Sequence, residues 1–294
     1  MKFLITGANG LVGRAVTRHL AVAGEEVAPF DHRSLDISDV NSVNAELGRE
    51  MPDVVINCAA WTDVDGCELD PDRAQTVNAL GPELLAAACR DIDALLITIS
   101  TDYVFDGTKE GFYTQRDQPN PLSAYGRAKL DGERRATIAW ARTIVVRSGY
   151  IFGAGGTNFL STVVQRARRD EPLRAISDMW GTPTYAVHLA ARLYRLAQLD
   201  LPGTYHVVNG GAGVSFEGFG RAALEAAGLD AGQLSGIGLS QMNRPAPRPR
   251  NSRLRCLVSE AIGLDSLPDW REGVHEFVGA AAPAPPADAV SRPA

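Results

Sequence analysis

The feature that most constrains the fold is a short apolar run at the start of the chain, followed at once by a glycine-rich turn. Residues 2–6 form a largely apolar run of the kind that makes a buried parallel strand. Gly7, Gly10 and Gly13 follow with the spacing G-x-x-G-x-x-G, and an amphipathic helical pattern then continues to Ala23. Glycines so placed permit a tight turn, a close approach of backbone to a phosphate and close packing of helix on strand. With the unpaired N–H groups of the helix N-terminus, this arrangement predicts a dinucleotide-binding unit.

The remainder of the first half alternates strand and helix. Apolar and β-branched runs predict strands at 26–30, 54–57, 94–99 and 143–147. Helical patterns lie between them, at about 39–49, at about 72–90 and from about 123. This alternation predicts an α/β fold with a doubly wound parallel sheet, the NAD(P)-binding Rossmann fold, over residues 1–150.

The second half has a looser pattern. Helices are expected at about 158–169, 187–198 and 216–227, with short strands at 173–176 and 204–208. Residues 244–250 are rich in Pro and Arg and are expected to form a loop. We interpret residues 151–279 as a smaller mixed α/β substrate-binding cap over the carboxyl edge of the sheet, with parts that return to the first domain. Residues 280–294, rich in Ala and Pro, are expected to be a disordered tail.

Composition excludes several classes of function. The chain has 294 residues and a net charge of −6, so no basic patch favours nucleic acid as a partner. Its four cysteines have no metal-ligand spacing and suit a reducing compartment. The apolar run that ends at Gly7 is too short for a signal peptide, and no run of about 18 apolar residues predicts a membrane span. A cytoplasmic protein is expected.

Tyr125 and Lys129 are the first candidate catalytic pair. Pro121 cannot continue a helix and Ser123 is a good N-cap, so a helix is expected to begin here with both side chains on one face. A free tyrosine has a pKa of about 10. A lysine one turn away is expected to lower that pKa and to make the phenol useful in acid–base chemistry near neutral pH. Taken alone, the pair also fits an exposed amphipathic helix.

The end of the second predicted strand bears on the choice of coenzyme. Asp31 lies near the roughly 20-residue offset at which a carboxylate binds the ribose hydroxyls, which favours NAD. Arg33 would instead accept the 2′-phosphate of NADP, since a guanidinium matches phosphate geometry. It fits equally well as a solvated loop charge. Asp36 and Ile37 would border the adenine.

Two further strand ends carry small or hydroxyl side chains. Cys58, Ala59 and Ala60 follow the third strand and leave room for a coenzyme, although a tight turn would explain them as well. Ser100 and Thr101 end the fourth strand, where a hydroxyl can hydrogen-bond a substrate carbonyl oxygen. As an isolated pair they also fit a simple turn.

These motifs together resemble the extended short-chain dehydrogenase/reductase superfamily and, within it, the dTDP-4-dehydrorhamnose reductase family. The resemblance covers the whole chain except the tail. The segments that match most clearly are the glycine turn and residues 53–60, 62–65, 100–107, 121–129, 181–184, 248–254 and 267–270. The resemblance implies NAD(P)H-dependent reduction of the C4 ketone of a dTDP-4-keto-6-deoxyhexose. NADPH is the expected coenzyme, with NADH also accepted, and a homodimer is compatible with the family.

The resemblance also implies roles for individual residues. The catalytic residues would be Thr101, Tyr125 and Lys129. The coenzyme-binding residues would be Gly7, Asn9, Gly10, Leu11, Val12, Gly13, Asp31, Arg33, Asp36, Ile37, Cys58, Ala59, Ala60, Asn78, Ser100, Tyr125 and Lys129. Those facing the nucleotide sugar would be Thr62, Val64, Thr101, Asp102, Tyr103, Tyr150 and Asn158.

Arg248 joins the substrate-facing set for a different reason. The diphosphate of a dTDP sugar needs cations or N–H groups, and the arginines of residues 244–253 form the one cationic cluster of the cap. Prolines stiffen this loop and reduce the entropy lost on binding. The alternative is a surface connection whose arginines are solvated or pair with carboxylates of the acidic body.

Two departures from the family pattern and two rival functions complete the interpretation. Tyr150 stands where the family has Trp, which puts the stacking of the sugar in doubt. Arg14 and Ala15 leave no carboxylate where some members have one linked to magnesium, so no metal site is expected. One rival is a nucleotide-sugar dehydratase or epimerase of the same superfamily. Those dehydratases carry Asp-Glu after the threonine, whereas Asp102 and Tyr103 follow here. A non-catalytic regulatory subunit of the same fold would keep the nucleotide site without needing the catalytic residues.

Overall fold

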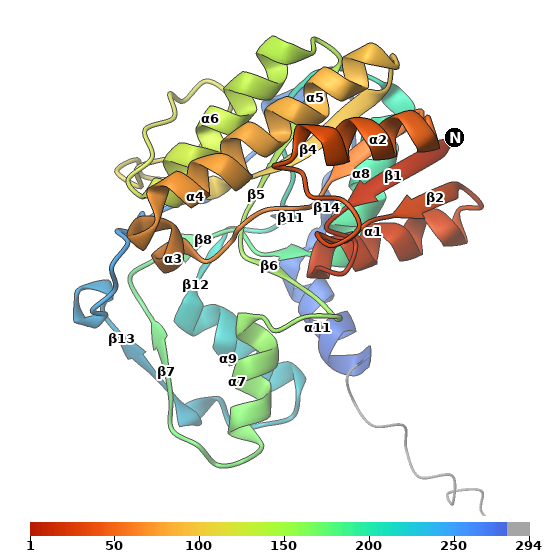
Figure 1. Cartoon of the computed structure of the whole chain (residues 1–294). Coiled ribbons are helices and arrows are strands. Elements are labelled where there is room, and N and C mark those ends of the chain that lie inside the picture. Colours follow the sequence, from red (N-terminus) through yellow and green to blue (C-terminus); the bar gives the residue numbers. More distant parts are fainter. Residues whose placement is uncertain (281–294) are drawn as a thin grey trace, which may run out of the picture.

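The computed structural model describes residues 1–280 and is organised around a sheet of six parallel strands, in the order β2-β1-β3-β4-β5-β10 (Figure 1). The strands are β1 (Lys2–Thr6), β2 (Glu26–Pro29), β3 (Val54–Asn57), β4 (Leu95–Thr101), β5 (Thr143–Ser148) and β10 (Gly203–His206). The chain runs from β1 to β2 on one side and then places β3 on the other side of β1. The strand order therefore reverses at β1, and a crevice opens at the carboxyl ends of β1 and β3. The predicted fold class is confirmed.

Helices cover both faces of this sheet, because successive residues of a strand point to opposite sides. Phe3, Ile5 and their equivalents pack under α1 (Leu11–Val22) and α8 (Ala186–Leu199). Leu4 and its equivalents pack under α2 (Val40–Glu50) and α5 (Gly81–Asp91). The helix α6 (Ala124–Ala139) lies beside α5 on this second face (Figure 1). Continuous apolar runs, which the sequence showed in β1, β3 and β4, are what two covered faces require.

The segment between β3 and β4 differs from the single helix predicted at 72–90. Instead, α3 (Val64–Leu69) precedes α4 (Pro71–Gln75), a π-helical turn (Thr76–Leu80) and α5. Gly132 of α6 lies so close to this turn that a side-chain carbon there would overlap the carbonyl oxygen of Asn78. The π turn thus brings Asn78 into the space between α6 and the loop after β3.

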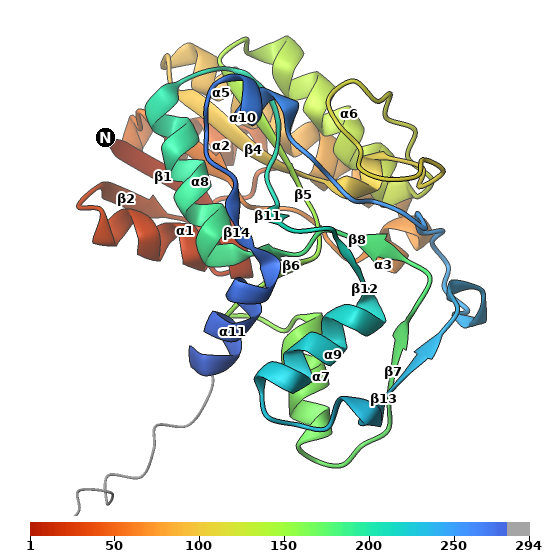
Figure 2. The same cartoon turned by 180° about the vertical axis from the view of Figure 1, so that it is seen from behind.

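The second half forms a small lobe below the sheet, and the C-terminal region that follows packs first on the large lobe, through α10 (Leu257–Ala261), and then against the small lobe, through α11 (Trp270–Ala280) (Figure 2). Two further helices of the second half are α7 (Phe159–Ala167) and α9 (Phe216–Ala226). Its strands form pairs, which are β6 (Ile151–Phe152) with β9 (Thr184–Tyr185), β7 (Leu173–Ile176) with β13 (Leu234–Ile237), β8 (Trp180–Gly181) with β12 (Val214–Ser215), and β11 (Asn209–Gly210) with β14 (Leu267–Asp269). Short 3-10 turns lie at Asp102–Val104, Ala231–Gln233 and Leu239–Gln241. The strand β10 and the helix α8 return to the large lobe, and an aromatic cluster that includes Phe152, Phe219 and Trp270 forms the core of the small lobe.

Within the described residues, no helix combines the length and the apolar character that crossing a membrane needs. The tail predicted at 280–294 lies outside the described residues except for Ala280, which ends α11.

Candidate active site

The glycine turn after β1 closes against the loop after β3. Gly7 has a φ of +61°, a conformation that favours glycine, and a side-chain carbon there would lie 2.7 Å from Ala59 N. A side-chain carbon at Gly13 would overlap the backbone of Gly7. Gly10 N donates to Gly7 O at 2.9 Å and closes the turn. Each of the three glycines therefore meets a requirement of the turn, and the N-terminus of α1 opens into the crevice.

A cavity of about 570 Å³ occupies this crevice and has the lining that a dinucleotide needs. Predicted residues that line it are Gly7, Asn9, Gly10, Asp31, Asp36, Ile37, Cys58, Ala59 and Ala60. Exposed glycine backbone at one end and a carboxylate at the end of β2 suit a pyrophosphate and a ribose, respectively. The residues present thus fit the coenzyme that the sequence predicted.

Asp31 is held in place by its neighbours. Its carboxylate accepts from Asn9 Nδ2 at 2.8 Å and from the backbone nitrogens of Arg33 and Ser34 at 3.0 and 3.1 Å. The bonds from Ser34 and Arg33, led by that from Ser34 N, lower the pKa of Asp31, so it is an anion at neutral pH. The exposed Arg33 side chain does not line the cavity, whereas its neighbour His32 does.

Tyr125 lies in the first turn of α6, which starts as the sequence predicted. Ser123 is the N-cap and accepts from Gly126 N at 3.2 Å. A side-chain carbon at Gly126 would overlap Tyr103 O, so glycine here lets the helix approach the turn after β4. Tyr125 is 9% exposed and packs with Cys67, Ala74 and Ala128. The helix thereby fixes the phenol at the end of β4.

Thr101 ends β4 and faces Tyr125 across a second cavity, of about 220 Å³. Thr101, Tyr125, Asp102, Ser100, Thr62 and Val12 line this cavity, together with Cys58 and Ala60. Cys58 and Ala60 also line the larger cavity. The cavity at the glycine turn is therefore the neighbour of the cavity that Thr101 and Tyr125 line.

Lys129 is buried one turn after Tyr125, but its head group is directed at the sheet. Its Nζ donates to Ile99 O at 2.7 Å, and burial lowers its pKa to about 8. Burial also raises the pKa of Tyr125 well above its ordinary value, and a hydrogen bond with Thr101 opposes this only in part. The net pKa of Tyr125 is therefore raised rather than lowered as predicted, because the loss of hydration dominates.

A buried ion pair lies directly beneath these residues. Arg147 of β5 and Glu133 of α6 are each 7% exposed, and Arg147 Nε and Nη2 donate to the carboxylate at 2.9 and 2.6 Å. Ser100 Oγ donates to the same carboxylate at 2.5 Å. Ser100 was predicted to contact the coenzyme. It lines the smaller cavity, but its hydroxyl proton is donated to Glu133.

The chemistry at this site is consistent with the comparisons with known proteins. A sequence profile described as the RmlD substrate binding domain matches residues 1–282. The chain belongs to this family. A dTDP-4-dehydrorhamnose reductase from Mycolicibacterium smegmatis is 38% identical over 282 residues, which cover 95% of this chain and 85% of that protein.

Solved structures of dTDP-4-dehydrorhamnose reductases are also similar to this chain in fold and in sequence. A dTDP-4-dehydrorhamnose reductase ortholog from Clostridium acetobutylicum has a TM-score of 0.92 and 37% identity, covering 96% of this chain and 99% of that one. A dTDP-4-dehydrorhamnose reductase from Bacillus anthracis, in complex with NADP, has a TM-score of 0.92 and 30% identity, covering 95% and 99%. The resemblance seen in the sequence is confirmed.

Several predicted site residues of this RmlD-family chain have their polar groups engaged in its own architecture. Asn78 donates to Trp61 O and accepts from Trp61 N, both at 2.9 Å, and so pins the loop after β3. Asn158 is the N-cap of α7, accepting from Ser161 N at 3.1 Å and donating to Gly153 O at 2.8 Å.

Three apolar residues of the predicted site lie at the starts of helices. Val64 begins α3 and packs against the cluster around Tyr125. Leu11 and Val12 begin α1, and Val12 alone of these two lines the smaller cavity.

Tyr150 has an unusual backbone conformation. Its φ is +46°, which costs a bulky residue about 1–3 kcal/mol. Its ring stacks on Phe216 with the centroids 4.2 Å apart, and its hydroxyl donates to Met179 O at 3.3 Å. The ring is thus held against the aromatic cluster of the small lobe.

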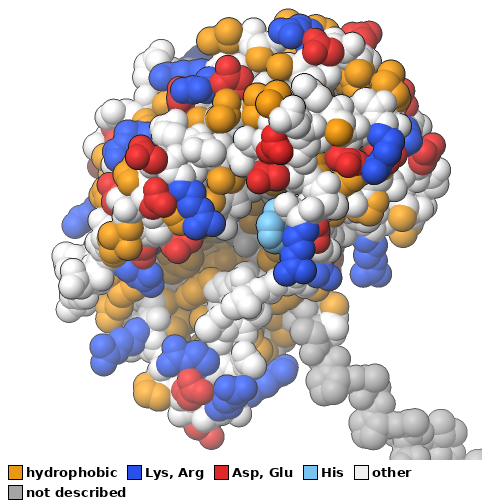
Figure 3. Space-filling view, viewed as in Figure 1, with side chains coloured by type: hydrophobic (Ala, Val, Ile, Leu, Met, Phe, Trp, Pro, Cys, Tyr) orange, Lys and Arg blue, Asp and Glu red, His pale blue; other side chains and the backbone are white. Residues whose placement is uncertain are grey.

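Residues 244–253, here called the cap loop, contribute to a third cavity of about 270 Å³. It is lined by Tyr103, Phe159, Phe216, Met242, Arg244 and Arg248. Figure 3 shows the surface hollowed between the lobes, with apolar side chains on the side of the small lobe. Arg248 Nη1 donates to Asp65 Oδ1 at 2.9 Å, and Arg244 Nη1 donates to Asp65 Oδ2 at the same distance. These bonds, led by that from Arg248, lower the pKa of Asp65 to about 2. Arg248 therefore pairs with a carboxylate of the large lobe, which was the alternative interpretation, while it also lines the cavity.

Sequence reasoning missed some residues of the site. Trp61 and Arg73 both line the coenzyme cavity, and the guanidinium of Arg73 lies 4.3 Å from the centre of the indole. Ser252 bonds to Asp102 beside Thr101. The aromatic and cationic residues after β3 were a signal in the sequence, but Ser252 lies far along the chain and gave none.

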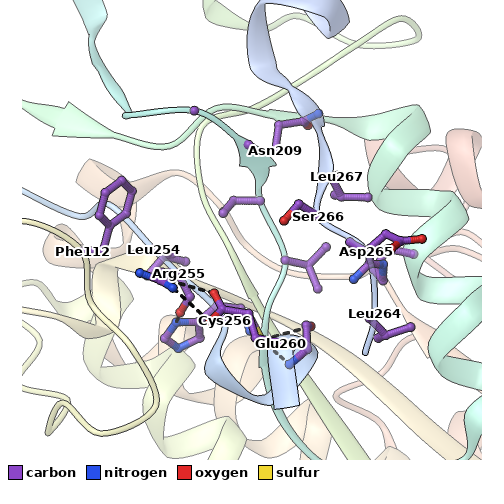
Figure 4. A pocket seen from close by; sticks show the side chains of 17 residues that line it. Phe112, Asn209, Leu254, Arg255, Cys256, Glu260, Leu264, Asp265, Ser266 and Leu267 are labelled. Carbon is purple, nitrogen blue, oxygen red and sulfur yellow. Dashed lines mark hydrogen bonds and ion pairs between the residues drawn. The ribbon is translucent and has the colours of Figure 1, made fainter. Parts of the chain in front are cut away.

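A further cavity, of about 320 Å³, lies away from this chemistry (Figure 4). Arg192, His206, Cys256 and Glu260 are among the residues that line it, beside the edge strand β10. None of the predicted site residues lines it within the part of the chain that the structure describes.

Proposed function

We propose that the protein reduces the C4 ketone of a dTDP-4-keto-6-deoxyhexose. NADPH, when bound at the glycine turn, supplies the hydride that adds to the carbonyl carbon. Tyr125 gives its hydroxyl proton to the developing alkoxide. Thr101 hydrogen-bonds the same oxygen, and Lys129 holds the nicotinamide ribose and stabilises the phenolate that remains. The observation that carries this proposal is that the cavity at the glycine turn and the cavity lined by Thr101 and Tyr125 are neighbours that share Cys58 and Ala60 as lining residues.

A single-turnover assay tests the proposal. The protein is mixed with NADPH and a dTDP-4-keto-6-deoxyhexose, and the absorbance of NADPH is followed. We expect NADPH to be consumed in proportion to the sugar. A dehydratase would show no net consumption of NADPH, and a regulatory subunit would bind NADPH without turnover. Either outcome would contradict the reductase.

The coenzyme preference is tested at Arg33. We expect NADPH and NADH both to support turnover, with a modest preference for NADPH. Arg33→Ala should raise the KM for NADPH roughly fivefold, the effect of an exposed ion pair worth about 1 kcal/mol, and leave that for NADH unchanged, because NADH has no 2′-phosphate. An equal change for both coenzymes would mean that Arg33 is only solvated.

The nucleotide half of the substrate is tested at Arg248. If Arg248 binds the diphosphate, Arg248→Ala should raise the KM for the dTDP sugar roughly tenfold, about 1.4 kcal/mol. Arg244→Ala is the matched control, because both arginines pair with Asp65 but the Arg244 side chain is 50% exposed and that of Arg248 only 14%. We expect a smaller effect for Arg244→Ala. Calorimetric titrations with dTDP and with NADPH separate the two sites, and unchanged dTDP affinity would remove Arg248 from the substrate site.

A further inference from the structure

Asp102 is a buried carboxyl group for which the reaction described above has no role. It is 3% exposed and lines the same cavity as Thr101 and Tyr125. Its Oδ1 accepts from Thr101 Oγ1 at 3.1 Å, and its Oδ2 accepts from Ser252 Oγ at 2.5 Å. A side-chain carbon at Gly149 would lie 2.5 Å from the carboxyl group, so the chain has room for Asp102 only because residue 149 is glycine. Asp102 thus links the Thr101 hydroxyl to a serine of the cap loop.

The hydrogen bonds of Thr101 make the charge of Asp102 important. Thr101 Oγ1 accepts from Tyr103 N at 3.1 Å, also lies within hydrogen-bond reach of the Tyr125 hydroxyl, and has a single proton of its own. In this arrangement that proton is donated to Asp102 rather than to the cavity. If Asp102 carries a proton, the carboxylic acid donates to Thr101 Oγ1, and the threonine hydroxyl is free to donate to a carbonyl oxygen in the cavity.

The surroundings of Asp102 favour the protonated form. The titratable groups that face it are Tyr103 in the following turn, Tyr125 of α6 and Tyr150 after β5, and the cap loop contributes the neutral Ser252. Among residues 1–280, no Lys, Arg or His forms a salt bridge with it. Burial without a cation raises the pKa of Asp102 to about 6, and the bonds from Ser252 and Thr101 oppose this only in part.

We propose that Asp102 is a positioning residue that sets the direction in which Thr101 donates, and that Ser252 of the cap loop holds its carboxyl group. The protonated acid turns Thr101 toward the substrate oxygen and keeps its own proton throughout the reaction. The carboxylate instead holds the Thr101 proton and weakens polarisation of the carbonyl group. This inference rests on the proposed reductase function.

Asp102→Asn provides the first test, because an amide can donate to Thr101 and accept from Ser252 at every pH, as the protonated acid does. We expect kcat of the wild type to fall on an alkaline limb with an apparent pKa at or above about 6. The variant should keep its low-pH kcat through this range and lose activity only where Lys129 titrates. Superimposable profiles, or a loss of more than tenfold in the variant at every pH, would overturn the proposal.

Ser252→Ala is a second variant with an opposite expectation. It removes a bond that stabilises the carboxylate, so the alkaline limb should move to higher pH instead of disappearing. Asp106→Asn is the matched control, since hydrogen bonds, led by that from Thr108 N, hold the pKa of Asp106 at about 2 and keep it ionised. That variant should leave the position of the limb unchanged. A limb that stays in place in Ser252→Ala would contradict the proposed link to the cap loop.

Thermal unfolding tests the titration without any substrate. A carboxyl group whose pKa is raised on folding stays protonated in the folded protein while the unfolded chain releases its proton, from about pH 4 to about pH 6. Stability is therefore lost as the pH rises through this window. Asp102→Asn should have a higher Tm than the wild type at pH 8, and the difference should shrink toward pH 4. If the wild type shows no turnover, the reductase function fails, while the Tm comparison still decides whether Asp102 titrates. A difference in Tm that does not change with pH would refute that titration.

Discussion

Tyr125→Phe is expected to lower kcat by a factor on the order of 10² or more, with little change in the affinity for NADPH. The substitution keeps the ring that packs with Cys67, Ala74 and Ala128, so helix α6 should hold its place. It removes the hydroxyl that faces Thr101 and would protonate the alkoxide. Because burial raises the pKa of Tyr125, the phenol is fully protonated at neutral pH and is suited to the direction of reduction. Stopped-flow absorbance of NADPH gives kcat, and fluorescence titration gives the affinity for NADPH.

Tyr113→Phe is the matched control for this variant. Tyr113 is also buried, at 4% exposed, and its hydroxyl donates to Asp106 Oδ1 at 2.9 Å outside the catalytic cavity. Losing that hydroxyl should lower stability slightly and leave kcat near that of the wild type. If Tyr125→Phe also retained kcat within about threefold, another group would have to supply the proton.

The parts of the fold that the sequence predicted are those set by local periodicity and by turn chemistry. The strands at 2–6 and 54–57 have the predicted bounds, because continuous apolar runs between turn signals need no knowledge of their partners. Ser123 could be recognised as the start of α6 for the same reason. The glycine turn was predictable because Gly7 and Gly13 meet steric requirements within the same short motif.

The parts that failed depend on partners distant in the chain. Arg248 and Asp65 are 183 residues apart, and Ser252 and Asp102 are 150 apart, so no local pattern relates them. The pKa of Tyr125 depends on burial by three separate elements, which outweighs a lysine one turn away. The position of Asn158 as the N-cap of α7 also depends on where that helix begins, and its predicted contact with the sugar stays a prediction.

The largest effect on stability is expected from the ion pair beneath the site. Arg147→Met should lower the free energy of unfolding by about 3–5 kcal/mol, because it leaves the Glu133 carboxylate buried without its cation. Methionine retains an apolar chain of similar length, although it loses the guanidinium that lies 5.3 Å from the centre of the Phe105 ring. Unfolding by urea, followed by fluorescence, gives this free energy, provided that the dependence on denaturant is the same in both proteins.

Arg135→Met on α6, the helix that carries Glu133, separates this effect from a general loss of charge. Arg135 pairs with Glu83 at 3.0 Å and with Asp131 at 2.9 Å, but its side chain is 44% exposed. Water and salt screen such pairs, so the loss should be below about 1 kcal/mol. Equal losses in the two variants would show that burial of the Arg147–Glu133 pair contributes nothing specific.

The double variant Arg147→Met/Glu133→Leu decides what the ion pair does for catalysis. With both charges removed, no unpaired buried ion remains, so much of the lost stability should return. We expect kcat of the double variant to stay below that of the wild type even where its stability is regained. Glu133 lies one turn after Lys129 on α6, and its charge opposes the fall in the Lys129 pKa that burial causes. Without that carboxylate, Lys129 loses its proton at lower pH, and Ser100 loses the acceptor that orients it beside Thr101. A stable double variant with kcat like that of the wild type would mean that the pair serves the fold alone.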